Sequence, residues 1–175
     1  MTLITTNSFS DAASSDFTSS IDSTYKLYIF KFTDVSPRVA AYFGFQANAS
    51  SQSGYNEVMT TTSIAAYNYE ATDDPQGPEY RTNNDQAQGT GLTYIGDYTD
   101  DDADHSLCGE MFLFNPSDTT YVTNFYTRTS QVFQVDAAFD TLVGGYINVT
   151  AAITNIQFKA STGNIDGTIQ MYGVG

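Results

Sequence analysis

The C-terminal segment 145–175 constrains the fold of this chain more than any other part, because apolar and polar residues alternate along it. Turn-forming residues at 161–164 and 166–167 divide the segment into runs. The apolar positions are Ile147, Val149, Ile153, Ile156, Phe158, Ile169, Met171 and Val174. A period of two residues, bounded by turns, is typical of antiparallel strands with one face in a core and the other in water. The segment therefore predicts strands, the last of them built into a sheet.

The same pattern recurs upstream and predicts an all-β protein. Strands are expected at about ten-residue intervals, a spacing typical of sandwiches and barrels, and Tyr and Phe are abundant. Residues 111–116 and 120–129 are expected to form a hairpin. We predict one antiparallel β-sandwich domain over residues 21–175, a jelly roll of about eight strands. The expected strands lie near residues 25–35, 42–48, 58–69, 92–96, 111–116, 120–129 and 132–135.

Residues 1–20 are rich in Ser, Thr and Asp and contain few apolar side chains. Such a segment is expected to be an N-terminal arm, either flexible or paired with a neighbouring subunit. Phe9 and Phe17 favour the second interpretation, because isolated aromatic side chains gain nothing in a free tail. Both residues are candidate partner contacts.

Charge limits the partners that such a chain would bind. Six basic residues against twenty acidic ones give a formal net charge of −14. Phosphate backbones and anionic lipid surfaces would repel the protein, so we expect neither nucleic-acid nor membrane binding. The N-terminus lacks the basic and apolar regions of a signal peptide, which predicts a protein made in a cytoplasm.

An acidic loop over residues 97–104 is the candidate ion site. Its carboxylates could surround Ca²⁺, which prefers six to eight oxygen ligands, although the glycine and terminal glutamate of an EF-hand loop are missing. The alternative is a solvated acidic loop, and we expect no cofactor. The candidate ligands are Asp97, Asp100, Asp101, Asp102 and Asp104.

Catalytic patterns are weak in this sequence. His105 lies near Cys108, the single cysteine, but nothing nearby supplies the orienting group and oxyanion pocket of a catalytic dyad. The four glutamates show no pairing that would indicate a glycosidase. We therefore expect no enzyme and assign no catalytic residue.

A long polar excursion over Thr72–Thr90 interrupts the strand pattern. Loops longer than about 15 residues in compact domains are often binding or assembly elements. Tyrosines in or beside it suit contact with protein or carbohydrate, and equally suit positions in the core. The candidate contacts are Tyr80, Tyr94 and Tyr98.

Six stretches of the chain, from about residue 17 to its end, carry turn and strand signatures: 17–25, 27–32, 85–89, 109–117, 145–148 and 161–173. These stretches resemble small structural proteins of marine tailed bacteriophage virions. The resemblance implies a component of the particle, located in the virion after synthesis in the host cytoplasm. It supplies no catalytic residues. We expect a capsid decoration (cement) protein that contacts other virion proteins such as the major capsid protein, as a homo-oligomer for which a trimer is one arrangement. The alternative is a receptor-binding module of a tail or tail fibre.

Overall fold

Within the part of the chain that the structure describes, the regular structure consists of thirteen β-strands. The computed structural model describes residues 1–71 and 76–175, and these residues form strands, turns and loops without a helix. The strands are β1 (Thr2–Ala12), β2 (Ser15–Phe17), β3 (Leu27–Pro37), β4 (Ala41–Ala49), β5 (Met59–Tyr69), β6 (Gly77–Tyr80), β7 (Gln86–Gly89), β8 (Thr93–Thr99), β9 (Leu107–Phe114), β10 (Thr123–Phe133), β11 (Ala137–Ile147), β12 (Ile153–Ala160) and β13 (Ile165–Val174).

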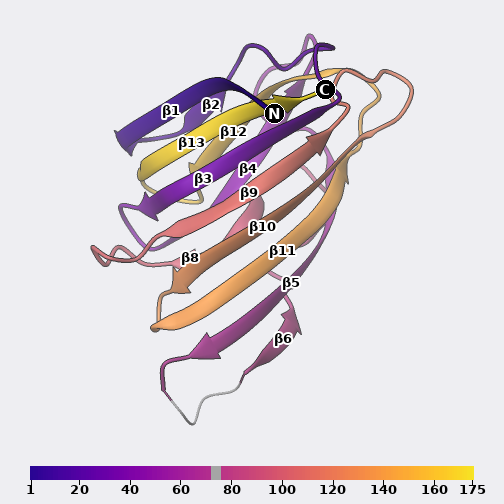
Figure 1. Cartoon of the computed structure of the whole chain (residues 1–175). Helices are drawn as coiled ribbons and strands as arrows, with labels where there is room; N and C mark the ends of the chain where they lie inside the picture. Colours follow the sequence, from indigo (N-terminus) through magenta and orange to yellow (C-terminus); the bar gives the residue numbers. More distant parts are fainter. Residues whose placement is uncertain (72–75) are drawn as a thin grey trace.

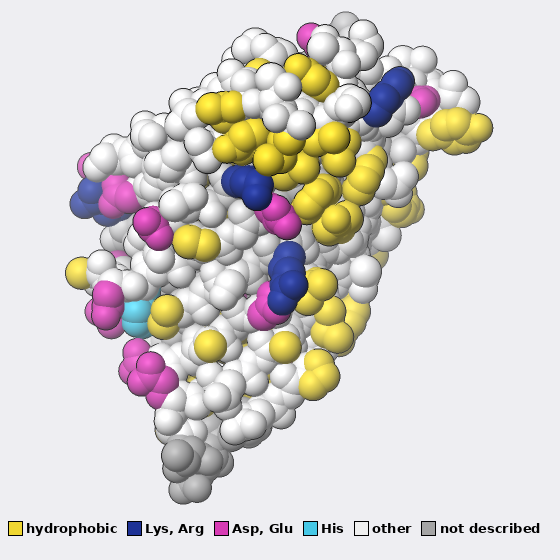
Figure 2. Space-filling view, in the orientation of Figure 1, with side chains coloured by type: hydrophobic (Ala, Val, Ile, Leu, Met, Phe, Trp, Pro, Cys, Tyr) yellow, Lys and Arg dark blue, Asp and Glu magenta, His cyan; other side chains and the backbone are white. Residues whose placement is uncertain are grey.

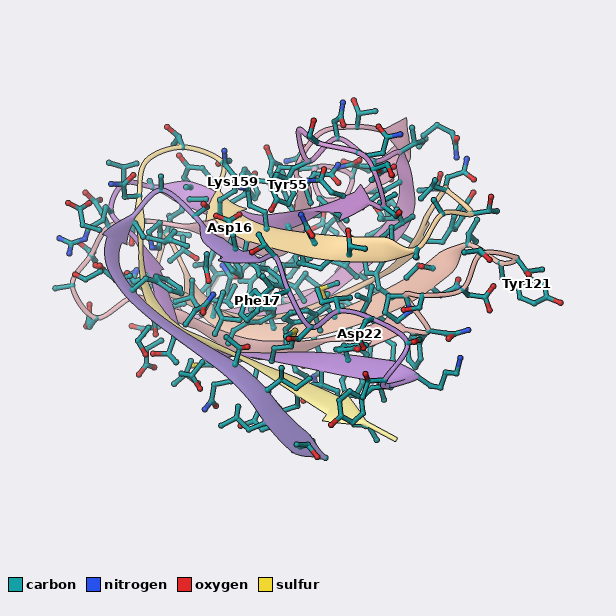
Figure 3. All side chains as sticks on the ribbon, turned by 90° about the horizontal axis from the view of Figure 1, so that it is seen from above. Asp16, Phe17, Asp22, Tyr55, Tyr121 and Lys159 are labelled. Atoms are coloured by element: carbon teal, nitrogen blue, oxygen red, sulfur yellow. The ribbon has the colours of Figure 1, made fainter. Side chains whose placement is uncertain are left out.

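The strands form two antiparallel sheets that pack face to face, as Figures 1 and 3 show. The larger sheet has nine strands in the order β1-β13-β3-β9-β10-β11-β5-β6, and β7 also pairs with β5. The smaller sheet has four strands in the order β2-β12-β4-β8. The predicted all-β sandwich is confirmed, and the hairpin expected near residues 111–129 is the β9–β10 pair.

The pairings between the two halves of the chain are nested. β1 pairs with β13, β2 with β12, β3 with β9, and β4 with β8. Two insertions enlarge this pattern: β5–β7 lie between β4 and β8 in the sequence, and β10–β11 lie between β9 and β12. The inserted strands all join the larger sheet beyond β9, which explains why it is more than twice as wide as its partner.

Aromatic rings fill the space between the two layers. Phe158 of β12 lies at the centre of this core, with its ring centroid 5.2 Å from those of Phe30 and Phe32 and 6.1 Å from that of Phe43. A smaller cluster around Phe139 lies under the inserted strands, where the guanidinium of Arg81 packs 5.5 Å from the ring centroid. The alternation in the C-terminal segment predicted Phe158 as an inward position, whereas no strand was predicted around Phe139.

The C-terminal segment forms strands, as its alternation predicts, with one correction. Residues 161–164 connect β12 to β13, but Asp166 and Gly167 lie inside β13 rather than in a turn. They form a β-bulge against β3, with Gly167 at a φ of +136°. A Cβ atom at this position would lie 2.8 Å from the carbonyl oxygen of Asp34, so the bulge requires glycine.

Residues 1–20 contain the first two strands of the sandwich. β1 pairs along its length with β13, and β2 pairs with β12. Phe17 lies between the layers with 3% of its surface exposed, and its ring packs edge-on against Phe30 and Phe158 (Figure 3). The segment reads as polar because an edge strand and a three-residue strand need few apolar side chains to be held in place.

The excursion over Thr72–Thr90 also contains more structure than expected. Residues 72–75 lie outside the described residues. The remainder includes β6 and β7, which both pair with β5 and extend the larger sheet. Each is only four residues long, which explains why their pattern is hard to distinguish from that of a loop.

Candidate interaction surface

The outer face of the larger sheet carries a broad apolar patch, which we call the apolar face. Figure 2 shows hydrophobic side chains gathered across the upper part of this face. They come from neighbouring strands, and the sheet register places them side by side. The apolar face consists of Leu27, Ile29, Ile64, Phe112, Phe114, Tyr126, Leu142 and Tyr172.

Aromatic contacts organise the centre of the apolar face. Phe112 on β9 lies directly opposite Tyr126 on β10, and their rings stack with centroids 4.6 Å apart and planes 17° apart. The ring of Phe114 lies 5.7 Å from that of Tyr126. Tyr126 and Phe114 nevertheless remain 44% and 38% exposed. Cross-strand stacking holds the rings in place before any partner binds, which lowers the entropy cost of binding.

Ion pairs neutralise the charge on this face. Lys31 lies 3.5 Å from Glu110, and the guanidinium of Arg128 donates to both carboxylate oxygens of Asp140 at 2.7–3.2 Å. Removing these two basic and two acidic residues from the totals of six and twenty leaves four basic and eighteen acidic residues, or −14. The rest of the chain therefore carries the whole net charge, and an approaching acidic surface meets less repulsion here than elsewhere.

Shallow hollows adjoin the ion pairs at the lower part of the face. Two open depressions of about 470 and 440 Å³ share Cys108 and Ser130 in their lining. They form because side chains on neighbouring strands are small: Cys108 and Ser130 lie opposite each other, and Ala138 of β11 is near them. Such hollows accept protruding side chains of a partner, whereas a buried reaction site requires an enclosed cleft.

The structure does not bring the predicted contact residues together. Phe17 is buried within this chain, with 3% of its surface exposed, and its contact with a partner stays a prediction. Phe9 of β1 is half-buried against the core. Tyr80 of β6 is 47% exposed, and its hydroxyl donates to Asp85 at 2.7 Å.

Tyr94 and Tyr98 lie on β8 in the smaller sheet and flank Tyr42 of β4. Tyr42 stacks on Tyr94 with ring centroids 4.5 Å apart, and Tyr98 meets Tyr42 edge-on at 5.0 Å. All three side chains are half-buried. Burial, together with the charge of Asp97, raises the pKa of Tyr42 above its ordinary value. The stacked and edge-on contacts of this tyrosine cluster join β4 to β8 in the smaller sheet.

The acidic loop does not gather its five carboxylates around one point. Asp97 is buried and forms an ion pair with Arg81, with Oδ2 2.7 Å from Nε. Asp100 contacts Nδ1 of the buried His105 at 2.6 Å, and Asp102 lies beside this pair. Ligand atoms of these three residues lie within 4.8 Å of one another, whereas Asp101 and Asp104 are exposed outside the group. Asp97 therefore pairs with Arg81 and lies outside the group formed by Asp100, Asp102 and His105.

His105 and Cys108 have different partners. His105 contacts Asp100 and, at 3.5 Å, Asp136. Cys108 is exposed on β9, where its sulfur accepts from the backbone N–H of Asp34 at 3.3 Å. Neither contact links the thiol to the imidazole.

The sequence did not lead to a prediction of the apolar face, although residues 111–114 contain a signal for it. Residues 111–114 are Met-Phe-Leu-Phe, an unbroken apolar run where a half-exposed strand should alternate. In the structure Met111 and Leu113 point into the core, while Phe112 and Phe114 point outward. A strand that is apolar on both sides of an antiparallel sheet indicates either burial on both faces or an outer face that meets a partner.

Neither protein-family models nor curated protein sequences match this chain. Among the residues that the structure describes, no helix is long and apolar enough to cross a membrane.

Proposed function

We propose that this chain is a structural protein of a bacteriophage virion, a capsid decoration (cement) protein that sits on the outer shell. The observation that carries the proposal is the apolar face: neutral, apolar and pre-ordered on a molecule whose other surfaces hold all of its net charge. Such a surface suits one-sided attachment to another protein, with the acidic remainder facing solvent and keeping particles apart.

The topology supports this proposal. We propose that the sandwich is a jelly roll, because a jelly roll is a long hairpin folded over into two sheets, and that folding produces nested pairs. The pairs β1·β13, β2·β12, β3·β9 and β4·β8 have this arrangement. Viral capsid proteins are among the main users of jelly rolls, alongside lectins and cupins. The resemblance of the sequence to phage virion proteins favours the first of these classes.

The test is incorporation of variants into phage particles. Tyr126→Asp places a charge at the centre of the apolar face and should abolish or strongly reduce incorporation. The matched control is Tyr121→Asp on the β9–β10 loop, where Tyr121 is 73% exposed at the loop tip in Figure 3 and should tolerate the same change. Equal incorporation of both variants would show that the protein does not attach through the apolar face.

The number of copies per virion tests where on the particle the protein is located. We expect densitometry of purified particles to give a stoichiometry comparable to that of the major capsid protein. A low copy number matching the tail would overturn the decoration role. Absence of the chain from particles would overturn the virion role altogether.

The second candidate function is a receptor-binding module of a tail or tail fibre. The exposed Tyr80 and Tyr121 favour it, because tyrosine side chains give rigid amphipathic contacts to protein and sugar. This alternative predicts that the isolated protein binds host cells and blocks infection, and it is abandoned if the protein does neither. Neither proposal includes a catalytic step.

A further inference from the structure

The sheet edges differ in how their unpaired main-chain groups are protected. Along β8, the side-chain amide of Gln131 bonds both main-chain groups of Asp97 at 2.7 and 2.9 Å, and Thr129 donates to the carbonyl of Ile95 at 2.7 Å. The edge strands β2, β6 and β7 have only three, four and four residues, and β6 contains Pro78. Short strands, proline and covering side chains are the usual means of preventing edge-to-edge pairing.

The edge strand β1 lacks these protections. It is eleven residues long, contains no proline or basic residue, and reaches its first charged side chain only at Asp11. Its two register shifts lie near its ends, which leaves Thr5–Phe9 as an unbroken stretch of ladder. Among the described residues, no hydrogen bond reaches the main chain of residues 2–10 from outside the pairing with β13. Figure 1 shows β1 at the margin of the larger sheet.

We propose that β1 pairs antiparallel with β1 of a second copy of this chain, about a two-fold axis at Asn7. The unbroken stretch Thr5–Phe9 is centred on Asn7. The axis therefore places Thr6 opposite the partner's Ser8, and Ser8 opposite the partner's Thr6. Alternate residues of an antiparallel pair exchange two main-chain bonds, which gives about four to six new hydrogen bonds over this stretch. The two larger sheets then become one continuous sheet, a mode of binding known as β-augmentation.

Charge favours a second copy as the occupant. Two molecules that each carry −14 repel over most approaches, but residues 2–10 contain no acidic side chain. In the proposed register, Asp11 and the partner's Asp11 are eight residues apart, about 27 Å at the rise of a β-strand. This separation is well beyond the screening length of roughly 8–10 Å at physiological salt. Closed two-fold dimers are also the commonest homo-oligomers.

Packing beneath the edge points to the same occupant. Ile4 and Phe9 pack against the core but stay half-buried, because β2 covers only a short length of the sheet. Figure 3 shows β1 diverging from β2, whose Asp16 and Phe17 are labelled. The proposed register places the partner's Phe9 opposite Thr5, beside Ile4, so each copy covers the half-buried edge of the other.

The test uses two matched double variants of the exposed residues Thr6 and Ser8, read by light scattering on a sizing column and by sedimentation. Thr6→Lys/Ser8→Lys places like charges directly opposite each other across the axis, with Cβ atoms about 4.5–5.5 Å apart. Thr6→Lys/Ser8→Glu places opposite charges there. We expect the wild type and the Lys/Glu variant to be dimers, and the Lys/Lys variant to dissociate with a dimer constant about ten-fold weaker or more. Both variants should keep the secondary structure of the wild type and show a melting transition.

Three results would overturn the proposal: a monomeric wild type, a trimeric wild type, or Lys/Lys and Lys/Glu variants that associate equally. If either variant fails to fold, hydrogen exchange on the wild type decides, since the amides of residues 5–9 that point away from β13 should be protected at high protein concentration and exchange freely on dilution. Exchange independent of concentration counts against the dimer. These measurements use the purified chain alone, so absence of the protein from phage particles would refute the proposed function and leave the dimer unaffected.

Discussion

Truncation of Phe17 to alanine tests whether this residue belongs to the core or to a detachable arm. In the structure its ring lies 5.1 Å from that of Phe30 and 6.0 Å from that of Phe158, with 3% of the residue exposed. Burial of a phenylalanine side chain contributes roughly 1.5–3 kcal/mol, and edge-to-face pairs add about 0.5–1.5 kcal/mol. Because the ring lies between two sheets, the cavity left by Phe17→Ala cannot collapse fully. We therefore expect a loss of about 3–5 kcal/mol in the free energy of unfolding.

Urea denaturation and thermal melting measure this loss directly. For a chain of this size, about 3–5 kcal/mol corresponds to a drop in melting temperature of roughly 6–20 °C. Phe9→Ala should cost clearly less, because Phe9 is only half-buried. Tyr121→Ala, at a 73% exposed position, should stay within about 0.5 kcal/mol of wild type. If Phe17→Ala also stays in that range, or costs less than Phe9→Ala, then residues 1–20 do not belong to the core of the protomer.

Further predictions concern the N-terminal strands, the buried ion pair and a loop carboxylate. Deletion of residues 1–20 should leave a chain that no longer gives a cooperative melting transition, because it removes β1, β2 and the Phe17 ring; a sharp transition near that of wild type would contradict the pairing of β1 with β13. Arg81→Met leaves the buried Asp97 carboxylate without its cation and should lower the free energy of unfolding, measured by urea denaturation, by about 3–5 kcal/mol. The double variant Arg81→Met/Asp97→Leu should recover part of this stability. If the single and double variants lose the same stability, the two residues do not act as a pair. Asp118 accepts from the backbone N–H groups of Tyr121 and Thr120, which hold its pKa below the ordinary 3.8. Its contribution is present above that value and is lost as pH falls through the lowered folded pKa, so Asp118→Asn should lower the melting temperature at neutral pH and make the difference from wild type shrink as pH falls below 3.8; a difference that does not change with pH would argue against the carboxylate.

Period-two alternation predicted many of the strands that have one face in the core, but most of β11 (Ala137–Ile147) was not predicted although it alternates. The pattern was insufficient where a strand has another role. β12 and β13 alternate because each has one face on the core and the other toward solvent. The buried residues Ile156, Phe158, Ile169 and Met171 mark the inner face. β1 does not show the pattern, because an edge strand that overhangs the smaller sheet needs few apolar contacts. The bulge at Gly167 reads as a turn because its residues, Asp-Gly, are the ones that turns also select.

Long-range pairing was the main feature that the sequence left open. Nothing local in β5 or β11 specifies that they pair with each other and extend the larger sheet, because the sequence separation between Met59 and its partner Ile147 exceeds the range of any turn signal. The apolar face depends on this extension: Ile64 and Leu142 lie beside each other only because β5 and β11 are neighbours. A surface composed of residues from six strands, β3, β5, β9, β10, β11 and β13, is visible only once their register is known.

The apolar face and the β1 edge are geometrically compatible. A two-fold axis that joins antiparallel edge strands into one sheet runs perpendicular to that sheet, so both copies present the same side of it. In the proposed dimer the two apolar faces would therefore point in one direction, next to each other, with Leu3 and Tyr172 linking each face to its β1 edge. Two weak docking surfaces held in one rigid plane bind a regular lattice far more tightly than either alone, because the second contact forms at high effective concentration. Such binding suits the decoration role proposed above, in which one chain attaches repeatedly to a regular shell.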